Sequence, residues 1–279
     1  MSPVYDCTTE QGRAEGVARA AEAVRNGEVV VLPTDTVYGV GADAFSPEAV
    51  ASVLAAKGRG REMPPPVLVP SVRTVDGLAS DVPQWARELI EAFWPGPLTL
   101  VLSAQSSLMW DLGETNGTVA LRMPRDDVAL ALLTEVGPMA VTSANLTGQP
   151  PATTVTDAAA QLGAAAAVYL DGGPTTSDEV STIVDCTGAD PVVLREGAIT
   201  WAQIQTALNP PPPDDEPFDA TAPEASEASE EPADEVTPAP PGEATTEEPV
   251  AAGASQPDGI QLPETPTSAG TDTGDPHER

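Results

Sequence analysis

Three residue types that commonly carry chemistry are scarce in this chain of 279 residues, which has one lysine, one histidine and two cysteines. The single histidine, His277, lies in a C-terminal segment whose composition argues against folding, so the part expected to fold has no imidazole. That absence excludes histidine-based acid–base catalysis, histidine-containing triads and most zinc sites there. Cys7 and Cys186 are too few and too far apart in the sequence for a disulfide framework or a metal cluster, so we expect no protein-held metal.

Long apolar runs are missing as well. No run approaches the about 20 residues that a membrane-spanning helix needs, and the N-terminus lacks the charged-then-apolar pattern of a targeting segment. We therefore expect a cytoplasmic protein with no membrane partner.

Basic residues are few, 12 against 43 acidic ones, and the formal net charge is −31. Residues 209–279 hold 18 of the acidic residues and a single basic one, in a sequence rich in Pro, Glu, Ala, Ser and Thr with Phe218 as its only aromatic side chain. Such a composition cannot bury enough apolar surface to offset the entropy lost on ordering. We predict one folded domain over residues 1–208 and a disordered acidic tail over residues 209–279.

Helical and strand patterns alternate along the predicted domain. The continuous apolar run at residues 29–32 indicates a strand buried on both faces, and apolar residues at helical spacing over 12–27 indicate an amphipathic helix. The predicted strands cover residues 29–32, 67–69, 98–102, 119–121, 139–141, 166–170, 183–184 and 192–194. The predicted helices cover residues 12–27, 46–56, 83–93, 126–135, 154–162 and 201–208. The alternation indicates an α/β fold with a twisted open mixed sheet and flanking helices.

The only lysine, Lys57, lies in the sequence Lys-Gly-Arg-Gly-Arg at residues 57–61. An ammonium and a guanidinium do different jobs, and side by side they suit a polyphosphate or a carboxylate with a phosphate. The intervening glycines let the backbone approach a ligand closely. A solvated basic turn after a helix is the alternative, and this segment alone does not decide between the two.

Polar residues follow several predicted strands. Thr34 and Thr36 come directly after residues 29–32, where open α/β sheets place ligands, although a capped turn explains them too. Arg122 ends an apolar strand and either reaches solvent or holds an anion. Residues 142–148 concentrate small hydroxyl and amide groups, which suit a polar ligand or an Asx-type turn. Six of the eleven basic residues before residue 209 lie in or beside such segments: Lys57, Arg59, Arg61, Arg122, Arg125 and Arg195. In an acidic domain this concentration indicates a positively lined pocket for an anionic small molecule.

Seven short motifs occur in a fixed order within about residues 12–208. They are Pro-Thr-Asp-Thr-Val-Tyr-Gly at 33–39, Lys-Gly-Arg at 57–59, Pro-Gly-Pro-Leu-Thr at 95–99, Ala-Leu-Arg-Met-Pro at 120–124, Ser-Ala-Asn-Leu-Thr-Gly at 143–148, Ser-Thr-Ile-Val-Asp at 181–185 and Arg-Glu-Gly at 195–197. Each motif is unspecific alone, but the ordered series resembles the threonylcarbamoyl-AMP synthase family, the YrdC/Sua5-like proteins, in its single-domain form. The resemblance implies a twisted open α/β sheet that forms a large concave, positively lined cavity.

The resemblance also implies an activity. A nucleotidyltransferase of this family converts L-threonine, bicarbonate and ATP into threonylcarbamoyl-AMP and pyrophosphate, with Mg²⁺ carried by the ATP. Partner proteins, a threonylcarbamoyl-transferase complex, then pass the threonylcarbamoyl group to an adenosine next to the tRNA anticodon. We expect at most weak tRNA binding, because residues 1–208 carry a net charge of −14 and phosphate contacts dominate nucleic-acid affinity.

The resemblance assigns the site residues motif by motif. Those matching threonine-binding positions are Thr36, Arg122, Ser181 and the backbone at Val141. Those matching ATP-binding positions are Arg59, Thr118, Ser143, Asn145 and Arg195. Lys57 and Arg59 are the expected catalytic groups, which would stabilise charge on the phosphoryl oxygens during transfer.

Three features depart from the family pattern. The loop after Arg59 is longer than usual, Pro70-Ser71 stands where members often carry a histidine, and the acidic tail stands in place of the C-terminal domain of the longer members. Two other functions stay open from the sequence. One is a non-catalytic RNA- or ribosome-associated binding module of the same fold, which the acidity disfavours. The other is carbamoyl transfer from carbamoyl phosphate, which the lack of zinc-finger and acylphosphatase-like parts disfavours.

Overall fold

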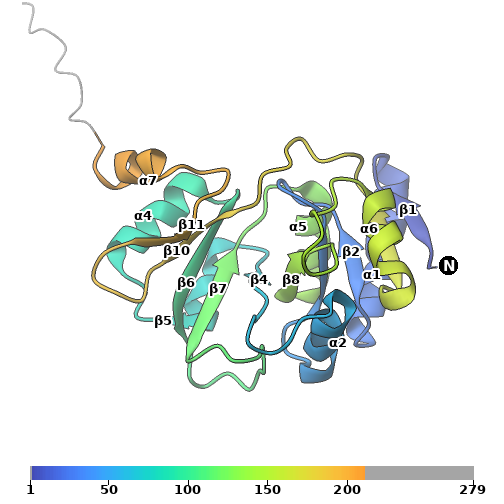
Figure 1. Ribbon diagram of the computed structural model, residues 1–279, viewed down its shortest axis with the longest axis horizontal. Coiled ribbons are helices and arrows are strands. Elements are labelled where there is room, and N and C mark those ends of the chain that lie inside the picture. The colour runs from blue at the N-terminus through green and yellow to red at the C-terminus, as the bar shows by residue number, and fades with distance from the viewer. Residues whose placement is uncertain (1, 211–279) are drawn as a thin grey trace, which may run out of the picture. The chain divides into compact units, whose positions relative to one another are not determined.

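The computed structural model describes residues 2–210, which form one mixed sheet with helices packed against it (Figure 1). The strands are β1 Val4–Asp6, β2 Val30–Leu32, β3 Gly39–Asp43, β4 Val67–Leu68, β5 Ala79–Ser80, β6 Leu98–Ala104, β7 Thr118–Arg122, β8 Met139–Ser143, β9 Val168–Asp171, β10 Thr182–Asp185 and β11 Val192–Arg195. The α-helices are α1 Glu10–Arg25, α2 Pro47–Lys57, α3 Val75–Leu78, α4 Gln84–Phe93, α5 Asp127–Val136, α6 Val155–Leu162 and α7 Trp201–Leu208, with short 3₁₀ turns η1 Val72–Thr74 and η2 Gly163–Ala165. The predicted mixed α/β fold is confirmed. From residue 211 on, the predicted disordered tail lies outside the described residues, so the division at residue 208 stays a prediction.

The strand order is β1-β9-β2-β3-β8-β4-β7-β6-β10-β11, with β5 paired to β6. The pairs β1–β9, β9–β2, β4–β7 and β6–β10 are parallel, and the remaining pairs are antiparallel. Strands that are distant in the sequence therefore lie side by side, and the ends of β2, β7, β8 and β10 come within reach of one site.

Helices start where capping signals occur in the sequence. The side-chain oxygens of Thr9, Ser46, Asp126, Thr154 and Thr200 each accept a hydrogen bond from a backbone N–H of the first turn that follows, as N-cap residues do. The helices stay short, and within residues 2–210 none combines the length and apolar content needed to cross a bilayer.

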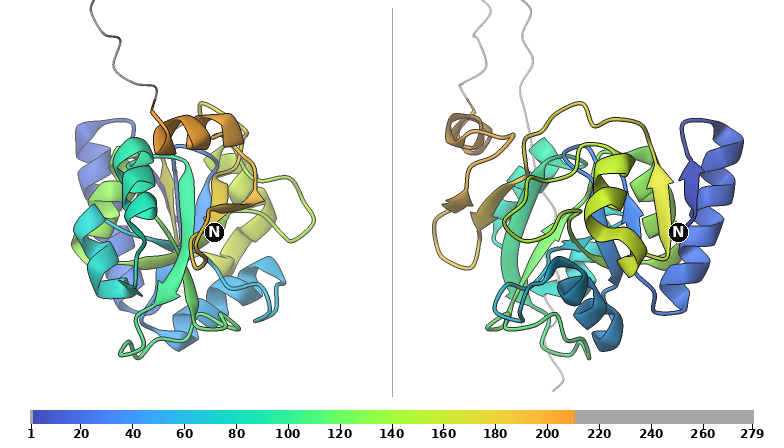
Figure 2. Two further views of the ribbon diagram at one scale, coloured as in Figure 1. Left: turned by 90° about the vertical axis from the view of Figure 1, so that its left-hand side faces the viewer. Right: turned by 45° about the vertical axis from the view of Figure 1, so that its right-hand side comes forward.

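The part of the sheet around β2 is covered on both faces. Val30 and Leu32 pack with residues of α1 and α5, whereas Val31 packs with residues of α2 and α6. Figure 2 shows helices on both sides of this part of the sheet. Because successive side chains of a strand point to opposite faces, a strand between two helical layers must be apolar at every position. The apolar run at residues 29–32 is therefore continuous because helices cover both faces of β2.

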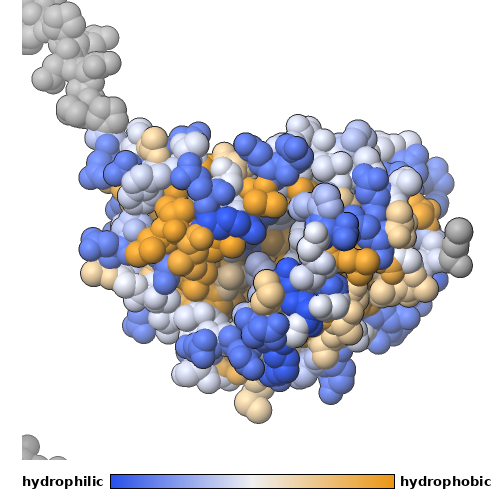
Figure 3. Space-filling view, viewed as in Figure 1, coloured by the Kyte–Doolittle hydropathy of each residue, from blue (hydrophilic) through white to orange (hydrophobic). Residues whose placement is uncertain are grey.

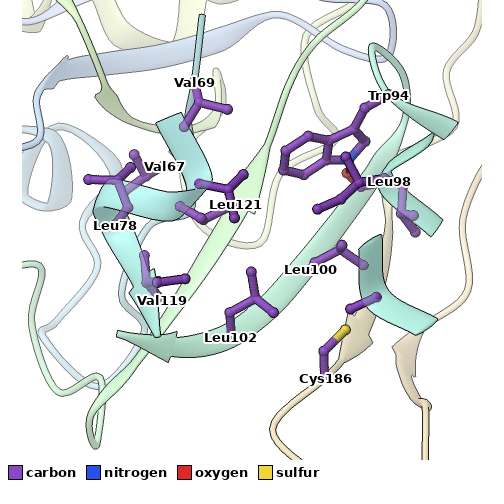
Figure 4. Packing of buried hydrophobic residues seen from close by; sticks show 14 of the residues in the cluster. Val67, Val69, Leu78, Trp94, Leu98, Leu100, Leu102, Val119, Leu121 and Cys186 are labelled. Carbon is purple, nitrogen blue, oxygen red and sulfur yellow. Dashed lines mark hydrogen bonds between the residues drawn. The ribbon is translucent and has the colours of Figure 1, made fainter. Parts of the chain in front are cut away.

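The part of the sheet around β6 and β7 has helices on one face. Leu98, Leu100 and Leu102 of β6 point into a core that α4 and α7 complete, together with Val119 and Leu121 of β7 (Figure 4). The alternate residues of the two strands point to the opposite face: Thr99, Val101, Thr118, Ala120 and Arg122. That face borders a cavity instead of a helix.

The sequence patterns do not predict β3, which pairs with both β2 and β8. Its sequence Gly-Val-Gly-Ala-Asp has low strand propensity. A Cβ atom at Gly41 would lie 2.7 Å from the carbonyl oxygen of Ala140 and 2.6 Å from Val141 Cγ2, so the close approach of β3 to β8 requires glycine there.

We expect Leu121→Ala to lower the free energy of unfolding by about 2–5 kcal/mol, because Leu121 is fully buried in the core cluster behind β4, β6 and β7 and its removal leaves a cavity. Urea denaturation measures this change. Met109→Ala is the control: Met109 is 93% exposed, and a change of less than about 0.5 kcal/mol is expected. Similar small losses for both variants would show that the β6–β7 face is not the packed core described above.

Candidate active site

A cavity of about 440 Å³ lies over the helix-free face of β6, β7 and β10, and the ends of β3 and β8 form its opposite wall. Ligand sites commonly measure roughly 300–1,000 Å³. In the space-filling view it is the hollow near the centre of the face, with apolar residues at its base and hydrophilic residues beside it (Figure 3). Eight of the ten predicted site residues line it: Thr36, Arg59, Thr118, Arg122, Val141, Ser143, Ser181 and Arg195. A larger depression of about 670 Å³ between α1 and α5 contains none of them.

Arg122 lies at the buried end of the cavity, with 6% of its surface exposed. Its Nε donates to the carbonyl oxygen of Gly96 at 3.1 Å, Nη1 to Thr36 Oγ1 at 3.0 Å, and Nη2 to Asp35 Oδ1 at 2.6 Å. Burial lowers the pKa of the guanidinium, and the Asp35 carboxylate opposes this shift. Since an arginine has five N–H donors, two remain without a partner among the described residues and are available to a ligand.

Ser181 and Arg195 form a second polar group of the cavity. Arg195 donates from Nε and Nη2 to the carbonyl oxygen of Ser181 at 3.1 and 2.7 Å, and from Nη2 to Ser181 Oγ at 3.1 Å. Ser181 Oγ also shares a hydrogen bond of 3.0 Å with Thr99 Oγ1. Burial, together with the positive charge of nearby Arg122, lowers the pKa of Arg195. Two guanidiniums that repel each other across a cavity are stabilised by an anion between them.

Arg59 enters the cavity from the end of α2. Gly58, with φ of +62°, caps that helix in the left-handed conformation and turns the chain so that Arg59 points toward β8. Arg59 Nη1 donates to Thr142 Oγ1 at 3.4 Å, while the buried Nε has no partner within residues 2–210. Burial lowers the pKa of this guanidinium. An arginine with an unused buried donor is a candidate for anion binding.

Lys57 and Asn145 lie behind the cavity wall and do not line it. Lys57 is 1% exposed, and its Nζ donates to the carbonyl oxygens of Ser143 and Asn145 and to Asn145 Oδ1 at 3.0 Å. Asn145 Nδ2 donates to the carbonyl oxygens of Leu146 and Gln149. The two residues thus hold the turn after β8 in shape. Lys57 contacts Ser143, which does line the cavity, whereas Lys57 and Asn145 are predicted to lie at the phosphates themselves.

Thr118 and Val141 line the cavity with part of their polar groups already engaged. Thr118 Oγ1 donates to the carbonyl oxygen of Thr115 at 2.8 Å, and the backbone N–H of Val141 donates to the carbonyl oxygen of Pro66 at 2.9 Å. A ligand at these positions meets the lone pairs of the Thr118 hydroxyl and the apolar side chain of Val141.

Four polar residues of the site have no role assigned to them from the sequence: Thr34 and Thr142, which lie in segments that the sequence singles out, and Asp35 and Thr99. Thr34 and Asp35 stand in the same motif as Thr36, and Thr99 interrupts the leucines of β6. A polar residue at alternate positions of an apolar strand is the signal that could find Thr99. Asp35 could not be found in this way, because its partner Arg122 is 87 residues away.

The unusually long loop after Arg59 borders the mouth of the cavity, which Met63, Pro64 and Pro66 line. The loop is tied to the segment before β7: Arg61 Nη2 contacts Asp111 Oδ1 at 2.7 Å, and Glu114 N donates to the carbonyl oxygen of Arg61 at 2.8 Å. The extra residues therefore extend one rim of the cavity.

A helix-free sheet face with unpaired guanidinium donors defines the class of site: a small-molecule cavity for anions in an α/β protein. The model of the Sua5/YciO/YrdC family, described as telomere recombination, matches residues 22–197. The chain belongs to this family, as its resemblance predicts.

Curated relatives carry the name threonylcarbamoyl-AMP synthase. A candidate synthase of Mycobacterium leprae is 55% identical over 208 residues, covering 75% of this chain and 94% of its own. The threonylcarbamoyl-AMP synthase of Bacillus subtilis is 41% identical over 197 residues, covering 70% of this chain and 57% of its own. Among solved structures, Sua5 of Pyrococcus abyssi complexed with L-threonine superposes with a TM-score of 0.71 at 33% identity, over 75% of this chain and 61% of that one.

We expect Lys57→Met to lower the free energy of unfolding by at least about 2 kcal/mol, because it leaves the carbonyl oxygens of Ser143 and Asn145 without their charged donor. Arg61→Met is the matched control, since Arg61 is a cation of the same loop in an exposed ion pair worth at most about 1 kcal/mol. Urea denaturation at about pH 7 compares them. Equal losses would contradict the assignment of Lys57 to the interior.

The burial of Lys57 also predicts that the free energy of unfolding depends on pH. Burial, followed by the charge of Arg59, lowers its pKa from 10.5 to about 8. Between about pH 8 and 10.5 the unfolded chain holds a proton that the folded chain has released, so this group makes the free energy of unfolding rise with pH. Below about pH 8 both states are charged and the folded state bears the desolvation cost. As pH rises through this window, the free energy of unfolding of the wild type should therefore increase relative to that of Lys57→Met. A difference that stays flat or falls would refute the lowered pKa of Lys57.

Proposed function

We propose that the chain is an L-threonylcarbamoyladenylate synthase, a nucleotidyltransferase that forms threonylcarbamoyl-AMP and pyrophosphate from L-threonine, bicarbonate and ATP. The observation that carries the proposal is the convergence of eight predicted ligand-binding residues, from six segments of the sequence, on one cavity. The relatives that share this fold and bear the name of that enzyme support it.

The cavity offers different surroundings to the two substrates. Thr36 and Arg122 are 2% and 6% exposed at one end, whereas Arg59 is partly exposed at the other. Ser181, which is 8% exposed, and the exposed Arg195 that donates to it stand together on the wall shared by the two substrates. A small amino acid suits the buried end, and Sua5 of Pyrococcus abyssi, which shares the fold, has been solved as a complex with L-threonine. The triphosphate suits the open end, because Arg59 and Arg195 do not appear in any ion pair of residues 2–210, whereas Arg122 is paired with Asp35.

The residues fit a reaction governed by position and charge. Threonine nitrogen adds to the carbon of bicarbonate, water leaves, and an oxygen of the resulting carbamate attacks the α-phosphorus of ATP, releasing pyrophosphate. Arg122 would hold the threonine carboxylate with its two free N–H groups. Arg59 and Arg195 would stabilise charge on the phosphoryl oxygens, and Ser143, held by Lys57, would border the same group. Mg²⁺ would enter the site bound to the phosphates of ATP, with water molecules as its other ligands.

The product would pass to a threonylcarbamoyl-transferase complex for modification of the adenosine beside the tRNA anticodon, in the cytoplasm. The acidity of the domain, −14 over residues 1–208, makes strong binding of tRNA to this chain unfavourable. The comparisons support the enzyme and give no support to the alternative of a non-catalytic RNA- or ribosome-associated module.

Pyrophosphate release from ATP tests the proposal. We expect release to require both L-threonine and bicarbonate, with threonylcarbamoyl-AMP identified by mass spectrometry. Release that needs carbamoyl phosphate instead would support carbamoyl transfer, and RNA binding without any release would support the binding module. Either result would overturn the proposal.

Two variants then separate the ends of the cavity. Arg59→Met should raise the KM for ATP about 10- to 100-fold, the loss of one or two charged hydrogen bonds, with little effect on the KM for threonine. Thr36→Val, at a residue whose hydroxyl bonds Thr34 and Arg122 and neither Arg59 nor Arg195, should raise the KM for threonine about tenfold with little effect on ATP. Arg87→Met, which removes an exposed cation on α4 paired with Asp76, is the control and should change neither. Parallel changes in both KM values for either site variant would contradict the two-ended arrangement.

A further inference from the structure

The groove of about 670 Å³ on the outside of the molecule lies between residues 10–25 of α1 and residues 131–135 of α5, and we call it the α1–α5 groove. Among residues 2–210 it shares no lining residue with the active-site cavity. The two helices run in the same direction, because Arg13 contacts Asp127 at the start of α5 and Arg25 contacts Glu135 near its end. Both views of Figure 2 show α1 at the outer edge of the molecule.

The floor of the α1–α5 groove is apolar, although the groove faces solvent. Ala14 and Ala18 of α1 are exposed, Ala131 of α5 is half-buried, and Val17 and Ala21 are buried. Side chains this small leave the groove deep. They allow a further helix to approach at the short end of the range of about 8–10 Å that separates packed helix axes.

The neighbouring row of α1 has the composition expected of a surface helix. Gln11, Glu15, Arg19 and Glu22 are exposed and pair with one another, since the Gln11 amide donates to Glu15 at 2.9 Å and Arg19 donates to Glu22. The row that lines the groove has only alanine and valine between its first and last residues. Because a solvent-facing row of a helix usually carries polar side chains, the apolar row indicates a face that another surface covers.

The charged residues at the two ends of the row identify that surface. Glu10 begins α1 and Arg25 ends it, about 22 Å apart along the helix axis. A second copy of α1, laid antiparallel along the groove, places its Arg25 opposite Glu10 and its Glu10 opposite Arg25. The same register sets Ala21 of the second copy opposite Ala14. A parallel copy would set Glu10 against Glu10 and Arg25 against Arg25, and these like charges disfavour it.

The antiparallel register is one that two-fold symmetry allows. The axis passes between Val17 and Ala18, so every contact from the first copy to the second is repeated in return. Glu10 has no ion-pair partner within residues 2–210. Arg25 Nη2 donates to the carbonyl oxygen of Glu135 at 2.9 Å and to its Oε2 at 3.3 Å, and a guanidinium has five N–H donors. Arg25 can therefore bind Glu10 of the second copy and keep Glu135.

The charge of the groove favours a second copy over other occupants. Its two acidic residues, Glu10 and Glu135, balance its two basic residues, Arg13 and Arg25, in a chain of net charge −31. A neutral surface does not attract nucleic acid or the acidic residues 209–279, and two copies of an acidic chain repel each other least there.

We propose that the α1–α5 groove is the interface of a homodimer. In this dimer α1 of each copy lies antiparallel in the groove of the other copy, and α1 and α5 of both copies form a four-helix bundle. The inference does not depend on the proposed function, because no residue of the groove takes part in it.

Sedimentation velocity of the full-length protein over a range of concentrations tests the dimer. An interface of two short helices from each copy lies at the lower end of the sizes found in specific complexes, so we expect a dissociation constant of about 1–100 µM. The mass should rise from 28.5 kDa toward twice that value as concentration increases. A wild type that keeps the mass of one chain up to about 1 mM overturns the proposal, whatever else binds the groove.

Ala18→Glu tests the position of the interface. Ala18 lies beside the two-fold axis, so this variant places two carboxylates where two small side chains meet, and the dissociation constant should rise at least about 100-fold. Ala51→Glu makes the same change at an exposed position of α2 and should leave the dimer unchanged. Both alanines are exposed, so thermal melting should show both variants folded. A dimer that persists in Ala18→Glu forms through another surface and overturns the proposal.

Two charge reversals test the antiparallel register. Glu10→Arg and Arg25→Glu each set like charges opposite one another at both ends of the groove, so each variant alone should associate about tenfold more weakly than the wild type. An equimolar mixture of the two variants restores opposite charges at both ends and should form a heterodimer about as tight as the wild-type dimer. A mixture that associates no more tightly than either variant alone overturns the register.

Discussion

The buried guanidinium of Arg122 is the interaction on which the arrangement of the site depends. It joins three separate segments, because it donates from β7 to Gly96 before β6 and to Thr36 and Asp35 after β2. A buried cation is tolerated only where its donors are satisfied and its charge is compensated, and removing one partner of such a pair commonly costs about 3–5 kcal/mol. Asp35 supplies the compensation, and its Oδ1 also accepts from the backbone N–H of Arg125. The segments that form the buried end of the cavity are thus fixed relative to one another before any ligand binds.

The sheet provides the space that this arrangement encloses. Around β2 two helical layers cover both faces, whereas around β6 and β7 one helical layer covers one face and the cavity occupies the other. The same strand alternation therefore serves two purposes in β6, with leucines in the core and Thr99 in the site. Binding residues on strands keep their positions because the core behind them is closely packed.

The basic residues of the site divide into three kinds with different surroundings. Arg122 is paired with an acid and buried, Lys57 is buried against carbonyl oxygens behind the wall, and Arg59 and Arg195 face the cavity without an acidic partner in the described part of the chain. A bound phosphate would therefore be the first negative charge to pair with Arg59 and Arg195. The lone lysine, which is the most conspicuous cation in the sequence, contacts the turn from Ser143 to Asn145 behind the cavity wall.

The sequence by itself determined the class of fold, the family and eight of the residues that line the cavity, because apolar alternation and short motifs are local properties of the chain. It did not determine β3, whose glycines oppose strand formation and are required by a neighbour, β8, about 100 residues away. It did not place Lys57 and Asn145 behind the wall, since nothing local distinguishes a cation that points into a cavity from one that points beneath it. Only the tertiary structure decided that Asp35 and Thr36 share Arg122 as a partner, because Arg122 reaches both of them from a different strand.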